Sequence, residues 1–173
     1  MNKILFIITG SIAASRCKEI IALLNINEVK ISCILTKEAK KYVKISDIKK
    51  LLKNRIFTDE DEKKNKMLHI NLSRDNDIIV MCPATANSIA KFANGYGDNL
   101  ASNTLLASNK KILFVPAMNS FMWHNKINQK NVRLLKDSGH EFIGPKIGNL
   151  KCGEFGLGRI DNSKNIVQRI LSK

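Results

Sequence analysis

The chain has no continuous apolar segment near the roughly 20 residues that a membrane-spanning helix needs. Its four cysteines include no Cys-x-x-Cys pair and no histidine at a ligand spacing, which argues against a zinc site. The short apolar stretch at residues 4–8 leads into Thr9-Gly10-Ser11 rather than a cleavage site, so it predicts a core strand and not a secretion signal. We therefore expect reduced thiols, a cytoplasmic location, no metal ion and no membrane partner.

Acidic residues are also scarce, with 15 Asp and Glu against 29 Lys and Arg, for a formal net charge of +14. Such a charge raises the possibility of a nucleic-acid partner. The lysines are scattered, however, and the densest group, at residues 37–53, alternates with apolar residues at the spacing of a solvated helix face. We expect no nucleic-acid partner, although a basic surface suits a phosphorylated small-molecule substrate.

The length of 173 residues predicts a single domain over residues 1–173, since domains commonly have about 100–200 residues. With 44% hydrophobic residues, a chain of this length can bury about 70% of its unfolded surface. Strand patterns alternate with helical patterns along the chain. The strand patterns lie at residues 3–9, 30–36, 77–82, 112–115 and 141–143. The helical patterns lie at residues 12–24, 38–53, 84–92, 100–108, 125–138 and 163–171. Residues 54–66 are expected to form a surface loop. This alternation predicts an α/β, Rossmann-like (flavodoxin-like) three-layer fold with a doubly wound parallel sheet.

Polar turns follow several of these strands, where open α/β sheets bind ligands. Gly10 allows a tight turn and Ser11 can cap the next helix, whose free N–H groups suit an anion. Thr36 ends the second strand at the same edge of the sheet. Small residues at 83–88 repeat the arrangement after the third strand, either as simple helix caps or as a surface for a flat aromatic ligand.

The segment Pro116-Ala117-Met118-Asn119-Ser120-Phe121-Met122-Trp123 is the most informative part of the chain. Packing alone accounts for its large apolar side chains. It does not account for Asn119, because a buried amide needs partners for several donors and acceptors. We therefore interpret this segment as part of a binding site.

Two further features have both structural and functional interpretations. His69 follows the charged segment; a histidine beside apolar residues is usually a packing residue, but it is also a natural base near neutral pH. Residues 145–160 are rich in glycine and carry no strand periodicity, which predicts a mobile flap. Cys152 on that flap can reach a site and donate a proton, or it can be incidental.

Together these residues resemble the family of flavin-dependent cysteine decarboxylases over nearly the whole chain. Residues 116–123 match the family's P-x-M-N-x-x-M-W motif at every fixed position, and residues 83–88 are similar to its P-A-S-A-N-T motif. Residues 10–13 resemble its phosphate loop, and residues 152–159 its substrate flap. Lys151 departs from the pattern, because the family more often has a small residue there.

The resemblance implies a role for each matching residue. Asn119 would bind the carboxylate of the substrate's cysteine, His69 would act as the base, and Cys152 would donate a proton in the final reduction. Other substrate contacts would come from Met118, Trp123, Asn149, Leu150 and Lys151. FMN would be held by Gly10, Ser11, Ile12, Thr36, Thr85, Ala86, Asn87, Ser88 and Ala117.

The resemblance also implies a reaction and partners. It is greatest to the branch that decarboxylates 4′-phosphopantothenoylcysteine to 4′-phosphopantetheine in coenzyme A biosynthesis, through transient oxidation of the cysteine moiety and loss of CO2. A homotrimer or a dodecamer built from trimers is expected, with the phosphopantothenoylcysteine synthetase on another chain. The alternatives are a peptidyl-cysteine decarboxylase and a non-catalytic flavin-binding regulatory subunit; a flavin prenyltransferase fits His69 and Asn119 less well.

Overall fold

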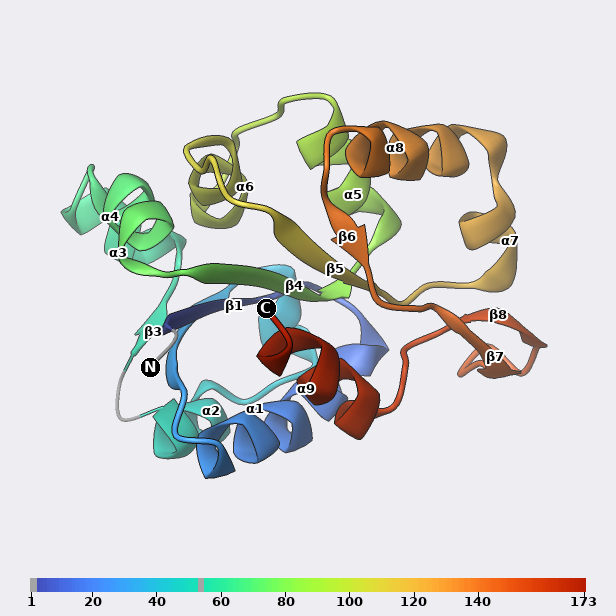
Figure 1. Ribbon diagram of the computed structural model, residues 1–173, viewed down its shortest axis with the longest axis horizontal. Helices are drawn as coiled ribbons and strands as arrows, with labels where there is room; N and C mark the ends of the chain where they lie inside the picture. The colour runs from blue at the N-terminus through green and yellow to red at the C-terminus, as the bar shows by residue number, and fades with distance from the viewer. Residues whose placement is uncertain (1–2, 53–54) are drawn as a thin grey trace.

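The computed structural model describes residues 3–52 and 55–173 and is built on a parallel sheet (Figure 1). The six strands lie in the order β3-β2-β1-β4-β5-β6, which confirms the predicted Rossmann-like, doubly wound architecture. Their bounds are β1 Lys3–Ile8, β2 Lys30–Leu35, β3 Ile56–Phe57, β4 Ile78–Ala84, β5 Ile112–Pro116 and β6 Glu141–Phe142. The order reverses between β1 and β4, where ligands of such sheets bind.

Helices cover both faces of this sheet (Figure 1). One face carries α1 (Cys17–Ile26), α2 (Ile45–Leu52) and α9 (Ser163–Leu171), and the other carries α4 (Leu68–Asp75), α5 (Ala86–Ala93), α6 (Leu100–Leu106) and α8 (Lys126–Asp137). The side chains of β1 alternate between the two core clusters, with Ile4, Phe6 and Ile8 in one and Leu5 and Ile7 in the other. Burial on both faces explains why this strand is apolar from Ile4 to Ile8. No helix in the described part of the chain is long and apolar enough to cross a membrane.

Several predicted boundaries were wrong. The single helix expected at 12–24 is a 3-10 helix, η1 (Ile12–Arg16), followed by α1. The helical pattern at 38–53 corresponds to two short helices, the 3-10 helix η2 (Glu38–Lys41) and α2. Residues 54–66 are not one loop, because they contain β3 and a short helix, α3 (Asp59–Lys64), begun by a capping box between Thr58 and Asp61. The helices α4 and α7 (Ser120–His124) were not predicted. Residues 53 and 54, where one predicted segment ends and the next begins, lie outside the described residues.

The glycine-rich segment also contains regular structure that the sequence analysis did not expect. Strands β7 (Lys146–Asn149) and β8 (Phe155–Arg159) pair antiparallel and extend from the end of the sheet beside α7 (Figure 1). Gly153, in the turn between them, has a φ of 89°, a conformation that favours glycine. The predicted flap is thus a hairpin, and its mobility stays a prediction.

Candidate active site

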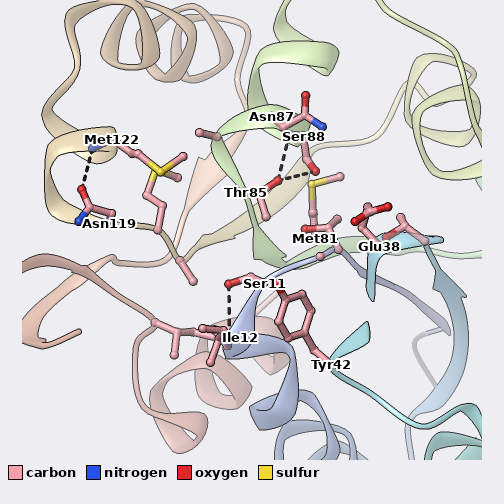
Figure 2. Close-up of a pocket in the computed structure, with 18 of the residues that line it drawn as sticks. Ser11, Ile12, Glu38, Tyr42, Met81, Thr85, Asn87, Ser88, Asn119 and Met122 are labelled. Atoms are coloured by element: carbon pink, nitrogen blue, oxygen red, sulfur yellow. Dashed lines mark hydrogen bonds between the residues drawn. The ribbon is translucent and has the colours of Figure 1, made fainter. Parts of the chain in front are cut away.

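A cavity of about 1090 Å³ lies at the carboxyl ends of the central strands. Every residue predicted to hold the cofactor lines it, and so do the predicted substrate residues other than Trp123. Figure 2 shows Ser11, Thr85 and Asn119 around this cavity, each from a different turn that follows a strand. The fold therefore brings together segments that are far apart in the sequence.

The turn after β1 forms one wall. Thr9 Oγ1 donates a buried hydrogen bond of 2.6 Å to the carbonyl of Pro83, which ties this turn to the end of β4. Ser11 caps η1, and its hydroxyl accepts from the amide of Ala13 at 3.3 Å. A Cβ atom at Gly10 would overlap the side chain of Glu38. Close packing against Glu38 therefore requires a glycine at this position.

The start of α5 forms the opposite wall. Thr85 caps the helix by accepting from the amide of Ser88 at 3.2 Å, and the two hydroxyl oxygens lie 2.9 Å apart (Figure 2). The first backbone N–H groups of a helix have no partner within it, so those of Ala86 and Asn87 can donate to a ligand. Hydroxyls, free amides and small side chains are thus concentrated on this wall, as a flat polar cofactor requires.

Basic side chains line the same cavity. Arg16 is paired with Glu19 at 3.1 Å, and Lys91 is paired with Asp98. The charged groups of Lys37, Lys151 and Arg159 have no carboxylate within 4.0 Å in the described part of the chain. These cations suit an anionic ligand such as a phosphate ester.

Asn119 has the partners that its amide requires. Its Oδ1 atom caps α7 by accepting from the amides of Phe121 at 2.8 Å and Met122 at 3.3 Å. Its Nδ2 atom donates to Glu154 Oε2 at 2.6 Å and lies 3.5 Å from Cys152 Sγ. Asn119 and Cys152, which the sequence analysis placed in one site, are therefore in contact. Glu154 was not predicted, because nothing in the local sequence indicates a contact between residues 35 positions apart.

The hairpin is packed tightly against this segment. The amide of Met118 donates to the carbonyl of Gly158 at 3.0 Å. A Cβ atom at Gly158 would overlap the carbonyl oxygen of Met118, and one at Gly156 would lie 2.7 Å from Ser120 Oγ. These glycines allow the close approach that sets the position of Cys152 relative to Asn119.

Replacing Gly158 with alanine should therefore disturb the site as well as the fold. We expect Gly158→Ala to lower the free energy of unfolding by about 1–3 kcal/mol, the usual cost of overpacking, and to weaken flavin retention. Denaturant titration and flavin absorbance measure the two effects. Gly95→Ala is the control, since its added Cβ meets nothing within 4 Å although its φ is 71°. Equal flavin loss in both variants would contradict a specific role for Gly158.

His69 does not line the cavity of its own chain. It lies in the first turn of α4, and its Nδ1 atom is 2.7 Å from Glu62 Oε1 on α3, without the geometry of a hydrogen bond. Glu62 was not predicted, because its segment was expected to be a loop. Trp123 is also outside the lining, since it is buried in the core cluster against which Met118 packs.

The four cysteines differ sharply in their surroundings. Cys17, Cys33 and Cys82 are buried, and burial raises the pKa of the Cys17 and Cys33 thiols. Cys152 alone is exposed, on the hairpin and in the lining of the cavity. It is therefore the one thiol placed to exchange a proton with a bound molecule.

Comparison with known proteins relates this geometry to a family. The chain is 32% identical over 173 residues to a probable phosphopantothenoylcysteine decarboxylase of Streptococcus mutans, covering 98% of this chain and 97% of that protein. It is 32% identical to the coenzyme A biosynthesis bifunctional protein CoaBC of Bacillus subtilis, covering 96% of this chain but only 42% of CoaBC.

Solved structures of decarboxylases are also similar to this chain. A PPC decarboxylase mutant complexed with pantothenoylaminoethenethiol superposes with a TM-score of 0.89 at 28% identity, covering 99% of this chain and 97% of that one. The peptidyl-cysteine decarboxylase EpiD superposes with a TM-score of 0.83, also at 28% identity, covering 98% of each chain. The family model described as Flavoprotein matches residues 1–173. The chain therefore belongs to the Flavoprotein family.

Proposed function

We propose that this protein is an FMN-dependent decarboxylase that converts 4′-phosphopantothenoylcysteine to 4′-phosphopantetheine. The observation that carries the proposal is the contact of the Asn119 amide with the exposed Cys152 at one cavity whose other walls have the donors that a flavin needs. The relatives named as phosphopantothenoylcysteine decarboxylases support it. A cytoplasmic location and a synthetase on another chain stay predictions.

The cavity has the donors and the space for FMN in particular. The hydroxyls of Ser11, Thr36, Thr85 and Ser88 and the free amides at the start of α5 would hold the polar groups of the cofactor, and the small Ala117 leaves room for the ring system. Lys37 directly follows Thr36 and lines the cavity, so it would offset the charge of the cofactor's phosphate. When bound, the flavin supplies a reversible two-electron oxidation of the substrate's cysteine moiety, which lets CO2 leave.

The protein's own residues would position the substrate and move protons. Asn119 Nδ2 would donate to the α-carboxylate, which places the bond to be broken near the flavin. After CO2 has left, Cys152 would donate the proton of its Sγ to the enethiolate as the product is reduced. The 3.5 Å between Asn119 Nδ2 and Cys152 Sγ supports a role for both groups at the same part of the substrate.

His69 would act from a neighbouring subunit. It does not line its own cavity, so a role as base requires that a second copy bring it to the substrate. Phe121 and Phe155, on α7 and β8 beside the cavity, are 79% and 74% exposed, as expected of residues that another copy covers. We therefore propose a homotrimer or a dodecamer built from trimers.

A peptide ending in cysteine is the second candidate substrate, because EpiD is as similar in sequence as the PPC decarboxylase structure. The cations Lys151 and Arg159 favour a phosphorylated substrate instead.

Initial decarboxylation rates on the two substrates, at equal concentration, would decide between them. We expect about a hundredfold preference or more for 4′-phosphopantothenoylcysteine, because cations placed for a phosphate are left unpaired by a peptide. A preference for the peptide would contradict the proposed substrate. Turnover of neither, by a protein that still binds flavin, would favour the regulatory alternative.

A further inference from the structure

The hydrogen-bonding capacity of Asn119 is fully used in this structure. Its oxygen accepts from two backbone amides at the start of α7, so only the two hydrogens of its NH2 group can bind a carboxylate. One hydrogen is donated to Glu154 Oε2 at 2.6 Å, and the other faces Cys152 Sγ at 3.5 Å. A substrate carboxylate and Glu154 would therefore need the same donors.

Glu154 is placed to make this contact by the hairpin turn. The amide of Leu150 donates to the carbonyl of Glu154 at 2.7 Å, and the amide of Gly153 donates to the carbonyl of Leu150 at 3.0 Å. Glu154 is half-buried, and no cation lies within 4.0 Å of its carboxylate in the described part of the chain. The Asn119 amide is therefore the polar group that holds this carboxylate in the site.

We propose that Glu154 is an internal competitor of the substrate's carboxylate for the Asn119 amide. This inference rests on the proposed function, which assigns that amide to the substrate. Two carboxylates close together repel each other, so the substrate must displace Glu154. Because Glu154 and Cys152 share one turn, its displacement also moves Cys152 away from the amide.

The competition has a consequence for the order of events. Decarboxylation removes the group that displaces Glu154, so Glu154 can then return to Asn119. Its return brings Cys152 back to the amide, beside the substrate carbon that needs a proton. Glu154 is in this account a positioning residue that makes delivery of the Cys152 proton follow the loss of CO2.

The inference is tested by the binding of two ligands that differ in one carboxylate. Calorimetry in a His69→Asn background, loaded with FMN, measures binding of 4′-phosphopantothenoylcysteine without turnover, and of 4′-phosphopantetheine, which lacks the carboxylate. We expect Glu154→Ala to bind 4′-phosphopantothenoylcysteine about tenfold more tightly, because one hydrogen bond to a charged group contributes an affinity of that size. The affinity for 4′-phosphopantetheine should not change. Glu154→Gln, which removes the charge but keeps the shape, should give a smaller change with the same selectivity.

A readout without ligand checks the same contact. Hydrogen exchange at the amides of Leu150 and Gly153 should be faster in Glu154→Ala, because the turn has lost its bond to Asn119. Asp137→Ala is the matched control, since it removes an exposed carboxylate at the end of α8, away from the cavity lining. It should change neither exchange nor binding.

The outcomes separate the inference from the proposed function. If both ligands bind, and Glu154→Ala raises the affinity for neither ligand or raises the affinity for both equally, Glu154 does not compete with a carboxylate. Unchanged exchange at the two amides would likewise show that Glu154 does not hold the turn. If neither ligand binds to the FMN-loaded protein with Glu154 intact, the proposed substrate is wrong and this inference is wrong with it.

Discussion

His69→Asn is expected to abolish decarboxylation while leaving the flavin bound. Loss of a general base usually slows a reaction by about 10²–10⁴-fold, and asparagine cannot accept a proton at neutral pH. The residues proposed to hold the flavin line the cavity and do not include His69, so flavin binding should not depend on it. Under anaerobic conditions, addition of 4′-phosphopantothenoylcysteine should reduce the flavin absorbance of the wild type transiently and should leave that of the variant unchanged.

The subunit arrangement can be tested with the same variant. If His69 acts on the cavity of a neighbouring copy, mixed oligomers of His69→Asn and Asn119→Asp chains contain some cavities with both residues intact. Such mixtures should regain activity that neither variant has alone. His124→Asn, which changes a histidine outside the cavity lining, is the control and should remain active. Flavin reduction by His69→Asn at the wild-type rate would show that the base is another group.

Cys152→Ser is expected to separate the two halves of the reaction. Oxidation and loss of CO2 should proceed, because Asn119 and His69 are intact. Reduction of the product should stall, because a serine hydroxyl is a far weaker acid than a thiol. Mass spectrometry should then show an enethiol product that lacks two hydrogens relative to 4′-phosphopantetheine, with the flavin left reduced.

Cys33→Ala is the matched control for this variant. Cys33 is buried in the core on β2, so its replacement should lower the stability of the protein. The Cys33→Ala enzyme should still produce 4′-phosphopantetheine. If Cys152→Ser makes the same product as the wild type at the same rate, the proton comes from a different donor. The raised pKa of the buried Cys17 and Cys33 thiols makes either of them an unsuitable replacement.

The layers of the fold follow directly from sequence patterns. The apolar run of β1 is buried on both faces, and the helical period at residues 163–171 corresponds to α9 at both ends. The hairpin β7–β8 could not be predicted in this way. Glycines pack no side chains across a strand pair, so the strands depend on tertiary contacts with the 118–120 segment, which no local pattern records.

The site was predictable where residues follow strands and not where contacts are long-range. Ser11, Thr36, Thr85 and Asn119 each come after a strand of one parallel sheet, so their convergence follows from the fold. Glu154 reaches Asn119 only through the hairpin, and Glu62 reaches His69 only because α3 packs on α4. A signal for α3 was present in the capping box of Thr58 and Asp61.

The most direct test of the proposed function is mass spectrometry of the purified protein incubated with 4′-phosphopantothenoylcysteine, after its flavin absorbance has been recorded. We expect a yellow protein that converts the substrate to 4′-phosphopantetheine with loss of CO2 and with the flavin oxidised again at the end. A protein that stays colourless after FMN is added, or a yellow protein that leaves the substrate unchanged, would contradict it.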